Sequence, residues 1–480
     1  MSQHCLQADT AGTNALKQNR VIRSINWFME SPWFVVSVCL MTAISNVLGA
    51  ELIVYPLFIL FGIYLALFGK DFLPIMSIVI CCYIAPSVLN NPGRNENSIF
   101  YPENGGIFLI VCFLLFAVSA VIRLVADKES FGKHFWKHKR KLSLGIVILG
   151  GAYLLAGAFS GRYFENGIHN LLFALIQFAA IFVCYWFFSG AVKWDRVNPN
   201  YFAWVGLGVG LTVCAEIIGI FVTEQVIVNS KIQTSLIASG WGNANNIGCM
   251  VAMMVPFAIG LAQQTKKTWL FCVLSLFMVI ITCLTCSRTA MGGAVIVYIL
   301  ALIPSLRDSS KRKQMLIFNA LALLLLIVLF IIFKGYLDRL FTELRSRGLN
   351  PRMREIIYPE GFRTFLKNPI FGEGFYPSTD KIYEWSSLDK FKAFLPARWH
   401  NTVIQLLASC GIAGILAYGF HRFQTVKLFW AKRKTPVFYI GLSLVALLLM
   451  SLLDCHFFNI GPTLFYSMAL AFGENICQEK

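Results

Sequence analysis

The chain has 480 residues, of which 57% are hydrophobic and only 14% are charged. A soluble globular protein is nearer about 45–50% apolar and about 25% charged. The composition therefore excludes an ordinary soluble enzyme, and an aromatic share of 14% excludes a disordered chain. The net charge of +17 comes from basic residues between apolar runs, which indicates membrane topology rather than nucleic-acid binding.

A membrane-spanning helix needs roughly 20 mostly apolar residues. By that measure the sequence predicts an all-α polytopic membrane protein with 12–14 transmembrane helices. The run at 289–304 is short, so that it is tilted, broken or partly re-entrant. The candidate spans are 32–49, 52–69, 72–90, 107–126, 142–160, 171–189, 201–223, 246–262, 269–286, 289–304, 315–333, 399–420, 436–453 and 457–472.

The orientation follows from Lys and Arg, which favour cytoplasmic loops. With the N-terminus inside, the inside segments hold 23 Lys or Arg, Arg422 among them, and the short outside loops hold four. Both termini are therefore expected in the cytoplasm. The predicted organisation is a cytoplasmic tail (1–31), eleven spans (32–333), a large extracytoplasmic loop (334–398) and three further spans (399–472).

The large outside loop is too long to be a bare connector, which predicts a functional role. Its segment 352–367 places apolar residues at near-helical spacing, interrupted by Pro359 and Gly361. We expect short amphipathic helices there, against the membrane surface. The Gly- and Pro-rich segment 368–375 is typical of a turn.

The short outside connection Ser287-Arg288-Thr289 fixes one arginine at the outer face, unless Arg288 only snorkels from a helix end. Arg352 and Arg354 open the helical part of the large loop. They are either solvated or bind phosphate oxygens, for which the guanidinium fork is well shaped.

A second set of polar residues lies at two further helix entries. Asn243 and Asn246 precede or open a predicted span, where asparagine either caps the helix or binds a hydroxyl-rich ligand. His400 follows Arg398 and precedes Asn401 where the large loop enters a span, so that it is a proton acceptor or a helix cap.

Three further features bear on the site. His169 and His456 are also expected outside, but without a neighbouring arginine. Gly411 and Gly414 predict a face for close helix packing. Most of the 14 cysteines lie in apolar runs, and the pair Cys283 and Cys286 lacks the further ligands that a zinc site needs. We expect no metal ion and no cofactor.

Together these motifs resemble the bacterial O-antigen ligases and the related polysaccharide polymerases and protein O-oligosaccharyltransferases. Three elements carry the resemblance: the His400-Asn401 pair, followed after nine residues by Gly411-Ile412-Ala413-Gly414; Ser287-Arg288 within Thr285–Ala290; and the Pro-x-x-Gly-x-Gly turn in Asn368–Phe375, preceded by an arginine near position 354. The resemblance covers roughly 200–460. Arg352 and Arg354 are alternative candidates for the single arginine that precedes the turn in the family. Fourteen spans would exceed the usual twelve of the ligases.

The resemblance implies a GT-C-like, metal-independent glycosyltransferase of the bacterial inner (cytoplasmic) membrane that inverts the configuration at the anomeric carbon. The donor would be a glycan on undecaprenyl diphosphate, and the acceptor a hydroxyl of lipid A-core, of another surface glycan or of a protein. His400 would accept the proton of the hydroxyl. Arg288 and Arg354, or Arg352, would bind the diphosphate, supported by Ser287, Asn243, Asn246, Arg398 and Asn401.

Two functions of other classes are weighed against this enzyme. A transporter or flippase of lipid-linked oligosaccharide would share the many helices, but the sequence shows no internal symmetry of the kind that transporters carry. A non-catalytic membrane scaffold would give no reason for the placement of His400 and the arginines. Within the enzyme class, ligase and polymerase share motifs, and the His400–Gly414 spacing favours the ligase.

Overall fold

The computed structural model describes residues 20–48, 50–84, 106–160, 167–223, 226–228, 231–232, 236–237, 244–307, 309–332, 334–335, 352–374 and 399–476. These residues are almost all helical, which confirms the predicted all-α class. The α-helices are α2 (Arg20–Met29), α3 (Pro32–Leu48), α4 (Glu51–Phe68), α5 (Ile75–Ile84), α6 (Gly106–Ala126), α7 (Lys133–Lys137), α8 (Ser143–Ser160), α9 (Gly167–Ala191), α10 (Tyr201–Thr223), α11 (Ala244–Gln264), α12 (Thr268–Leu284), α13 (Arg288–Arg307), α14 (Ser309–Ile332), α16 (Arg352–Lys367), α18 (Thr402–Ala431), α19 (Val437–Ser451) and α20 (Ile460–Asn475).

Shorter elements connect some of these helices. A π-helical turn, η3, covers Lys128–Gly132, and two 3₁₀ turns cover Trp194–Arg196 (η4) and His456–Phe458 (η7). The two-residue strands β1 (Ile227–Val228) and β2 (Lys231–Ile232) pair antiparallel, with Ile227 opposite Ile232. This hairpin was not predicted from the sequence, but it is too short to change the fold class.

Each of the fourteen predicted spans overlaps one helix, although several of these helices are short for a bilayer. In the described part of the chain, four helices are long and apolar enough to span it alone, in α9, α10, α11 and α18. A fifth arises if α2 and the first part of α3, which meet at 70°, form one bent span. The protein is thus a multi-pass membrane protein, and the number 12–14 stays a prediction.

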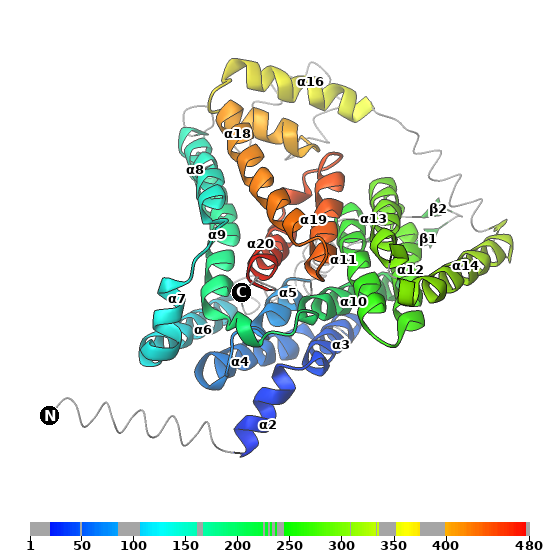
Figure 1. Ribbon diagram of the computed structural model, residues 1–480. Helices are drawn as coiled ribbons and strands as arrows, with labels where there is room; N and C mark the ends of the chain where they lie inside the picture. Colours follow the sequence, from blue (N-terminus) through cyan, green and yellow to red (C-terminus); the bar gives the residue numbers. More distant parts are fainter. Residues whose placement is uncertain are drawn as a thin grey trace.

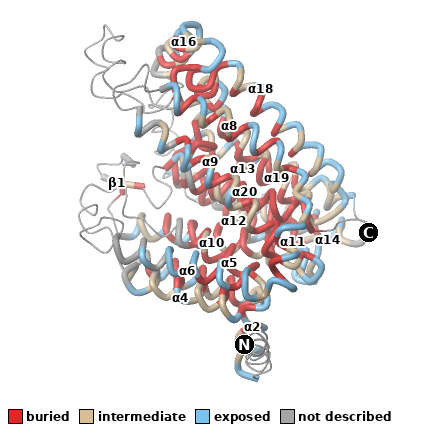
Figure 2. The backbone as a smooth tube through the Cα atoms, turned by 90° about the vertical axis from the view of Figure 1, so that its left-hand side faces the viewer, coloured by how far each residue is buried: buried red, intermediate tan, exposed pale blue. Residues whose placement is uncertain are grey.

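Helix α11 forms the centre of the molecule. Every residue from Ile247 to Ala262 is buried, because the helix is apolar all round and packs against α10, α12, α13 and α19. The peripheral helices instead turn apolar side chains outward, as Leu321 and Leu324 on α14 do at 55% and 57% exposure. Buried residues accordingly concentrate in the middle of the molecule, as Figure 2 shows. Such outward-facing leucines suit a lipid environment.

The segment 352–367 is one continuous helix, α16, rather than several short ones. It lies across the top of the molecule in Figure 1, beside the first part of α18. Ile357 of α16 packs with Trp399 and Ala408 in a small cluster of its own, and a Cβ on Gly361 would lie 2.5 Å from Ile404. This packing explains why the helix continues through Pro359 and Gly361.

Helix α18 is kinked, and it extends further than the predicted span 399–420. Gly411 has φ 62° and ψ −157°, so two helical segments meet there. The helix continues to Ala431, and this corrects the assignment of Arg422 to an inside loop. The Arg422 guanidinium lies 4.4–4.7 Å from the ring centroids of Tyr418, Phe457 and Tyr466. Three aromatic faces thus surround this charge within the helix bundle.

Candidate functional site

Asn401 is the N-cap of α18 and also joins this helix to α19. Its side-chain oxygen accepts hydrogen bonds from the backbone N–H groups of Val403 and Ile404, at 2.8 and 3.1 Å. Its amide group donates to the carbonyl oxygen of Leu452 at 2.7 Å, just beyond the end of α19. Asn401 is therefore a cap, and it fixes the position of the preceding residue, His400.

His400 is held beside an acidic residue, Asp454, that is not among the predicted site residues. Its backbone lies in the left-handed region, with φ 50°, and its Nδ1 is 3.0 Å from Oδ1 of Asp454. The side chain of His400 is 39% exposed, whereas that of Asp454 is 14% exposed. An ionised carboxylate only accepts hydrogen bonds, so Nδ1 carries the proton and Nε2 of the neutral ring is left as the acceptor.

The surroundings of Asp454 keep this carboxylate ionised. Burial raises the pKa of the Asp454 carboxyl. The hydrogen bond with His400, the charges of His456 and His400, and the backbone N–H of Cys455 outweigh burial and hold the pKa well below its usual range. The Cys455 amide donates to the same oxygen, Oδ1, at 2.7 Å. At neutral pH the pair is therefore a carboxylate and a histidine oriented by it.

Asn246 and His456 form a second polar contact nearby. Oδ1 of Asn246, in the first turn of α11, lies 2.9 Å from Nδ1 of His456 and accepts a bond from Nδ2 of Asn459 at 3.0 Å. His456 is only 1% exposed. This buried side chain therefore joins α11 to the segment that carries Asp454, a contact that the sequence did not predict.

Helix α16 holds the backbone on both sides of the His400–Asp454 pair. Arg354 donates from Nη2 to the carbonyl oxygen of Leu453 at 2.7 Å, next to Asp454. The Tyr358 hydroxyl, one turn further along, donates to the carbonyl oxygen of His400 at 3.2 Å. Arg354 thus lies beside the pair, while Arg352 begins the helix.

Ser287 and Arg288 lie at the same end of the bundle, in the tight turn between α12 and α13. Ser287 is 3% exposed, and its hydroxyl accepts from the backbone N–H of Ala290 at 3.3 Å. Arg288, the first residue of α13, is exposed. The turn packs on the start of α11, where a Cβ on Gly248 would lie 2.6 Å from Cβ of Ala290. This places Arg288 near the α11 turn that carries Asn246.

The turn after α16 fits into the kink of α18. An α-helix would join residues 412 and 413 to the carbonyl groups of 408 and 409. Instead, the N–H groups of 412 and 413 and the carbonyl groups of 408 and 409 all form hydrogen bonds with the turn. These four backbone groups at the kink therefore have partners, as a membrane interior requires. The four hydrogen bonds run from Ile412 N to Pro369 O (2.8 Å), Ala413 N to Ile370 O (3.1 Å), Glu373 N to Ala408 O (2.9 Å) and Gly374 N to Ser409 O (3.0 Å).

Glycine is required at two positions of this junction. A Cβ on Gly411 would lie 2.4 Å from the carbonyl oxygen of Ile370, and one on Gly372 2.3 Å from the carbonyl carbon of Ser409. Both residues also have positive φ angles, 62° and 70°. The predicted close-packing face of Gly411 and Gly414 is therefore not a contact between two helices. Gly411 admits the turn, and Gly414 faces Cys410 of its own helix.

The structure brings His400, Asn401 and Arg354 together, and it adds Asp454, Tyr358 and His456. Asn243 and Arg398 lie outside the described residues. Asp454 had one signal in the sequence, since an ionisable residue at the end of an apolar run is a functional candidate. Within the described part of the chain, no group of three or more His, Cys, Asp or Glu side chains is arranged to hold a metal ion.

Comparison with known families gives one match. Residues 270–419 match the family described as O-antigen ligase. No curated protein matches the chain. The matched region contains Arg288, α16, the turn and His400, and it confirms the predicted resemblance to the O-antigen ligase superfamily. Asn246, Asp454 and His456 lie outside it. The match supports a membrane enzyme that transfers glycans.

Proposed function

We propose that the protein is a glycosyltransferase that moves a glycan from undecaprenyl diphosphate to an acceptor hydroxyl at the outer face of the bacterial inner membrane. The observation that carries the proposal is the His400–Asp454 pair, a partly exposed histidine oriented by a carboxylate that is only 14% exposed. The pair lies at the end of the bundle to which the charge distribution assigns the outer side. The family match supports the class of reaction.

In the proposed reaction His400 is the general base. Its Nε2 takes the proton of the acceptor hydroxyl, while Asp454 stabilises the imidazolium that forms. The acceptor oxygen then forms a bond to the anomeric carbon. The bond from that carbon to the phosphate oxygen breaks, and its electron pair leaves with undecaprenyl diphosphate. Attack opposite to the leaving group inverts the anomeric carbon.

The leaving diphosphate needs positive charge, which we assign to arginines at the same end of the bundle. Arg288 is exposed at the start of α13, and Arg354 donates to the carbonyl oxygen of Leu453 through Nη2. A guanidinium carries five N–H donors, so several remain for phosphate oxygens. Arg352, at the start of α16, is the alternative to Arg354. This assignment requires neither a metal ion nor a cofactor.

The proposed acceptor is lipid A-core or another surface glycan, which corresponds to a ligase. Transfer to a growing polysaccharide or to a protein is the alternative within the superfamily. A flippase of lipid-linked oligosaccharide is the alternative of another class. The His400–Asp454 pair favours the enzyme, because moving an intact lipid requires no base.

The test is transfer from a lipid-linked glycan in isolated membranes. His400→Ala should lower turnover by about 10²–10⁴-fold, the usual contribution of a positioned base, and leave donor binding largely intact. His169→Ala, on α9, is the matched control and should have little effect. Near-normal turnover in His400→Ala would show that His400 has only a structural role at the start of α18 and is not the base. Loss of donor binding together with turnover would assign it to recognition instead.

A further inference from the structure

A basic cavity of about 940 Å³ lies at the other end of the bundle from His400. There α11 and α13 end, and a short turn joins α18 to α19. The cavity is lined by Gln263, Gln264, Leu300, Ile303, Pro304, Arg307, Trp430, Arg433, Lys434, Thr435, Pro436, Phe438, Tyr439 and Leu442. Three of these residues are cationic and none is acidic, so that the cavity suits an anion.

The three cations come from two separate elements. Arg307 is the last residue of α13, whereas Arg433 and Lys434 belong to the turn between α18 and α19. All three are exposed. Arg433 is also positioned, because its Nη1 donates to the carbonyl oxygen of Trp430 at 3.0 Å and its guanidinium lies 5.2 Å from the Trp430 ring centroid. An anion bound here would join α13 to the α18–α19 turn.

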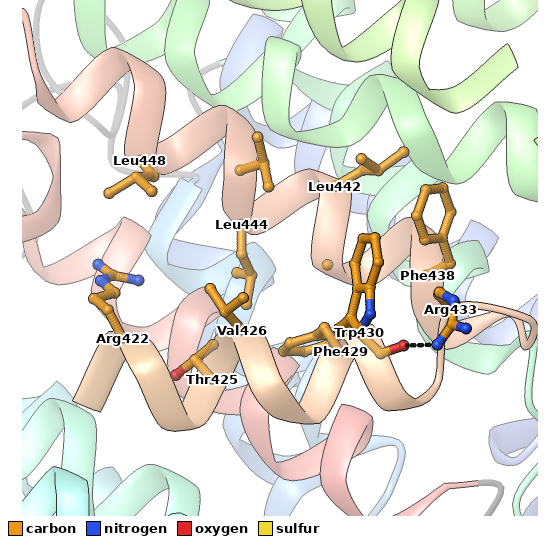
Figure 3. Close-up of a pocket in the computed structure, with 12 residues that line it drawn as sticks. Arg422, Thr425, Val426, Phe429, Trp430, Arg433, Phe438, Leu442, Leu444 and Leu448 are labelled. Atoms are coloured by element: carbon orange, nitrogen blue, oxygen red, sulfur yellow. Dashed lines mark hydrogen bonds between the residues drawn. The ribbon is translucent and has the colours of Figure 1, made fainter. Parts of the chain in front are cut away.

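An apolar groove of about 210 Å³ continues from this cavity between α18 and α19. The two share Trp430, Arg433, Phe438 and Leu442. Figure 3 shows the groove, with Arg433 at one end, Arg422 at the other and aliphatic and aromatic side chains between them. The wall residues Val426 and Trp430 are 61% and 66% exposed, so the groove opens to the surroundings of the bundle.

We propose that the cavity and the groove together bind one anionic phospholipid. Its phosphate contacts Arg307, Arg433 and Lys434, and one acyl chain lies along the groove between α18 and α19. A cationic pocket between helices at the membrane surface, next to an apolar path into the bilayer, matches both parts of such a lipid. Trp430 lies where the two parts meet, at the level that tryptophan prefers in membranes.

A soluble phosphate compound would use only half of this site. It would contact the three cations and leave the groove between Val426 and Leu448 unused. A zwitterionic lipid would fill the groove but gain less from the cations. The observations therefore favour a lipid with net negative charge, taken from the leaflet on the side opposite to His400.

The experiment uses the full chain in nanodiscs of equal parts phosphatidylglycerol and phosphatidylcholine. Native mass spectrometry then counts the lipids that the released protein retains. We expect one phosphatidylglycerol to be retained preferentially. The triple variant Arg307→Gln, Arg433→Gln, Lys434→Gln should weaken its retention by about 10- to 100-fold, since each basic residue near a membrane surface contributes appreciably to binding an anionic lipid.

A matched triple variant controls for charge alone. Lys128→Gln, Lys137→Gln and Lys139→Gln change exposed lysines that line neither cavity, and retention should stay unchanged. A second variant tests the groove independently. Val426→Trp should fill it and lower retention, whereas Leu416→Trp, at a 68% exposed position of α18 outside the groove, should not.

Three results would overturn the proposal. One is equal retention of phosphatidylglycerol and phosphatidylcholine. Another is the same retention in the two triple variants. The third is displacement of the lipid by sn-glycerol 1-phosphate at a concentration similar to that of the lipid. That result would mean that the groove contributes nothing to lipid binding. None of these results depends on glycan transfer, so the site is tested separately from the proposed function.

Discussion

Asp454 determines which nitrogen of His400 is able to take a proton. The carboxylate accepts from Nδ1, and this leaves the lone pair of the neutral ring on Nε2. An isolated histidine at a helix entry would exchange between both tautomers and would turn about its side-chain bonds. The pairing with Asp454 removes both freedoms, and this is the arrangement that a general base requires.

Asp454→Asn should therefore impair transfer although the shape of the side chain is kept. The Asn amide can donate to Nδ1, which places the ring proton on Nε2 and blocks the base. We expect turnover to fall by about 10²-fold or more, within the range of a positioned base. The measurement is transfer in membranes, at matched protein levels. Asp195→Asn, at a 76% exposed position, is the control and should be neutral.

The pH profile gives a further check on the same residue. The pKa of Asp454 is lowered, so the carboxylate contributes to stability above the ordinary carboxyl pKa. That contribution is lost only as the pH falls through the lowered value. Protonation of Asp454 is therefore not expected to limit activity between neutral and mildly acidic pH. Unfolding of the wild type together with loss of activity in that range would contradict the assigned ionisation.

At the scale of residues, the sequence indicated one half of the polar site. His400, Asn401 and Arg354 stand next to recognisable signals: a helix entry, a cap and an arginine before a turn. Asp454 is 54 residues away from His400, in the segment after α19, so no local pattern connects the two. His456 and its partner Asn246 are likewise 210 positions apart, so no local pattern indicated their contact.

At the scale of elements, the junction of α18 with the turn 368–374 depends on backbone geometry. Alanine at position 411 would need the positive φ and extended ψ of this glycine, which costs roughly 1–3 kcal/mol, and would also press its Cβ against Ile370. We expect Gly411→Ala to lower both thermal stability in detergent and transfer, because the start of α18 carries His400. Melting followed by tryptophan fluorescence measures the first effect.

Gly419→Ala in the same helix is the matched control. Nothing lies within 4 Å of a Cβ at Gly419, and its backbone is helical. Alanine is favoured over glycine there by roughly 0.5–1 kcal/mol, so melting should stay equal or rise. Equal melting and equal transfer in both variants would mean that the kink is not needed.

The kink itself was beyond the sequence. Gly411 and Gly414 fit a packing face between helices as well as they fit a break, because periodicity does not state which partner approaches. The turn was predicted, but its partner was not. Similarly, Pro359 and Gly361 predicted interruptions in 352–367. Packing on Trp399 and Ile404 keeps α16 continuous, since tertiary contacts override local propensity.

At the scale of the whole molecule, the sidedness is the remaining prediction. The ends of α16, α18 and α19 that carry the polar site should face the outside, and the lysines after α6 should face the cytoplasm. The test introduces Arg363→Cys on α16 or Lys139→Cys, each on a cysteine-depleted background. The two cysteines should differ in their reactivity with a membrane-impermeant maleimide. Position 363 should react in intact cells, and position 139 only after permeabilisation.

The reverse labelling pattern would place the polar site inside and would remove the lipid-linked donor from its reach. It would not affect the fold, which rests on packing around α11. Reaction at both positions in intact cells would instead mean that the cells were leaky. The cysteine-depleted parent without either substitution gives the background signal.

The His400–Asp454 contact has a consequence for engineered hybrids. The family region ends at residue 419, so a chimera that exchanges only 270–419 takes its histidine from one parent and its carboxylate from the other. Gly411 and the turn 368–374 would both come from the first parent. The residues Leu452 and Leu453, whose carbonyl groups accept hydrogen bonds from Asn401 and Arg354, would come from the second. A hybrid that exchanges residues through Asn459 keeps each of these contacts within one parental sequence, and it is therefore the better unit to exchange.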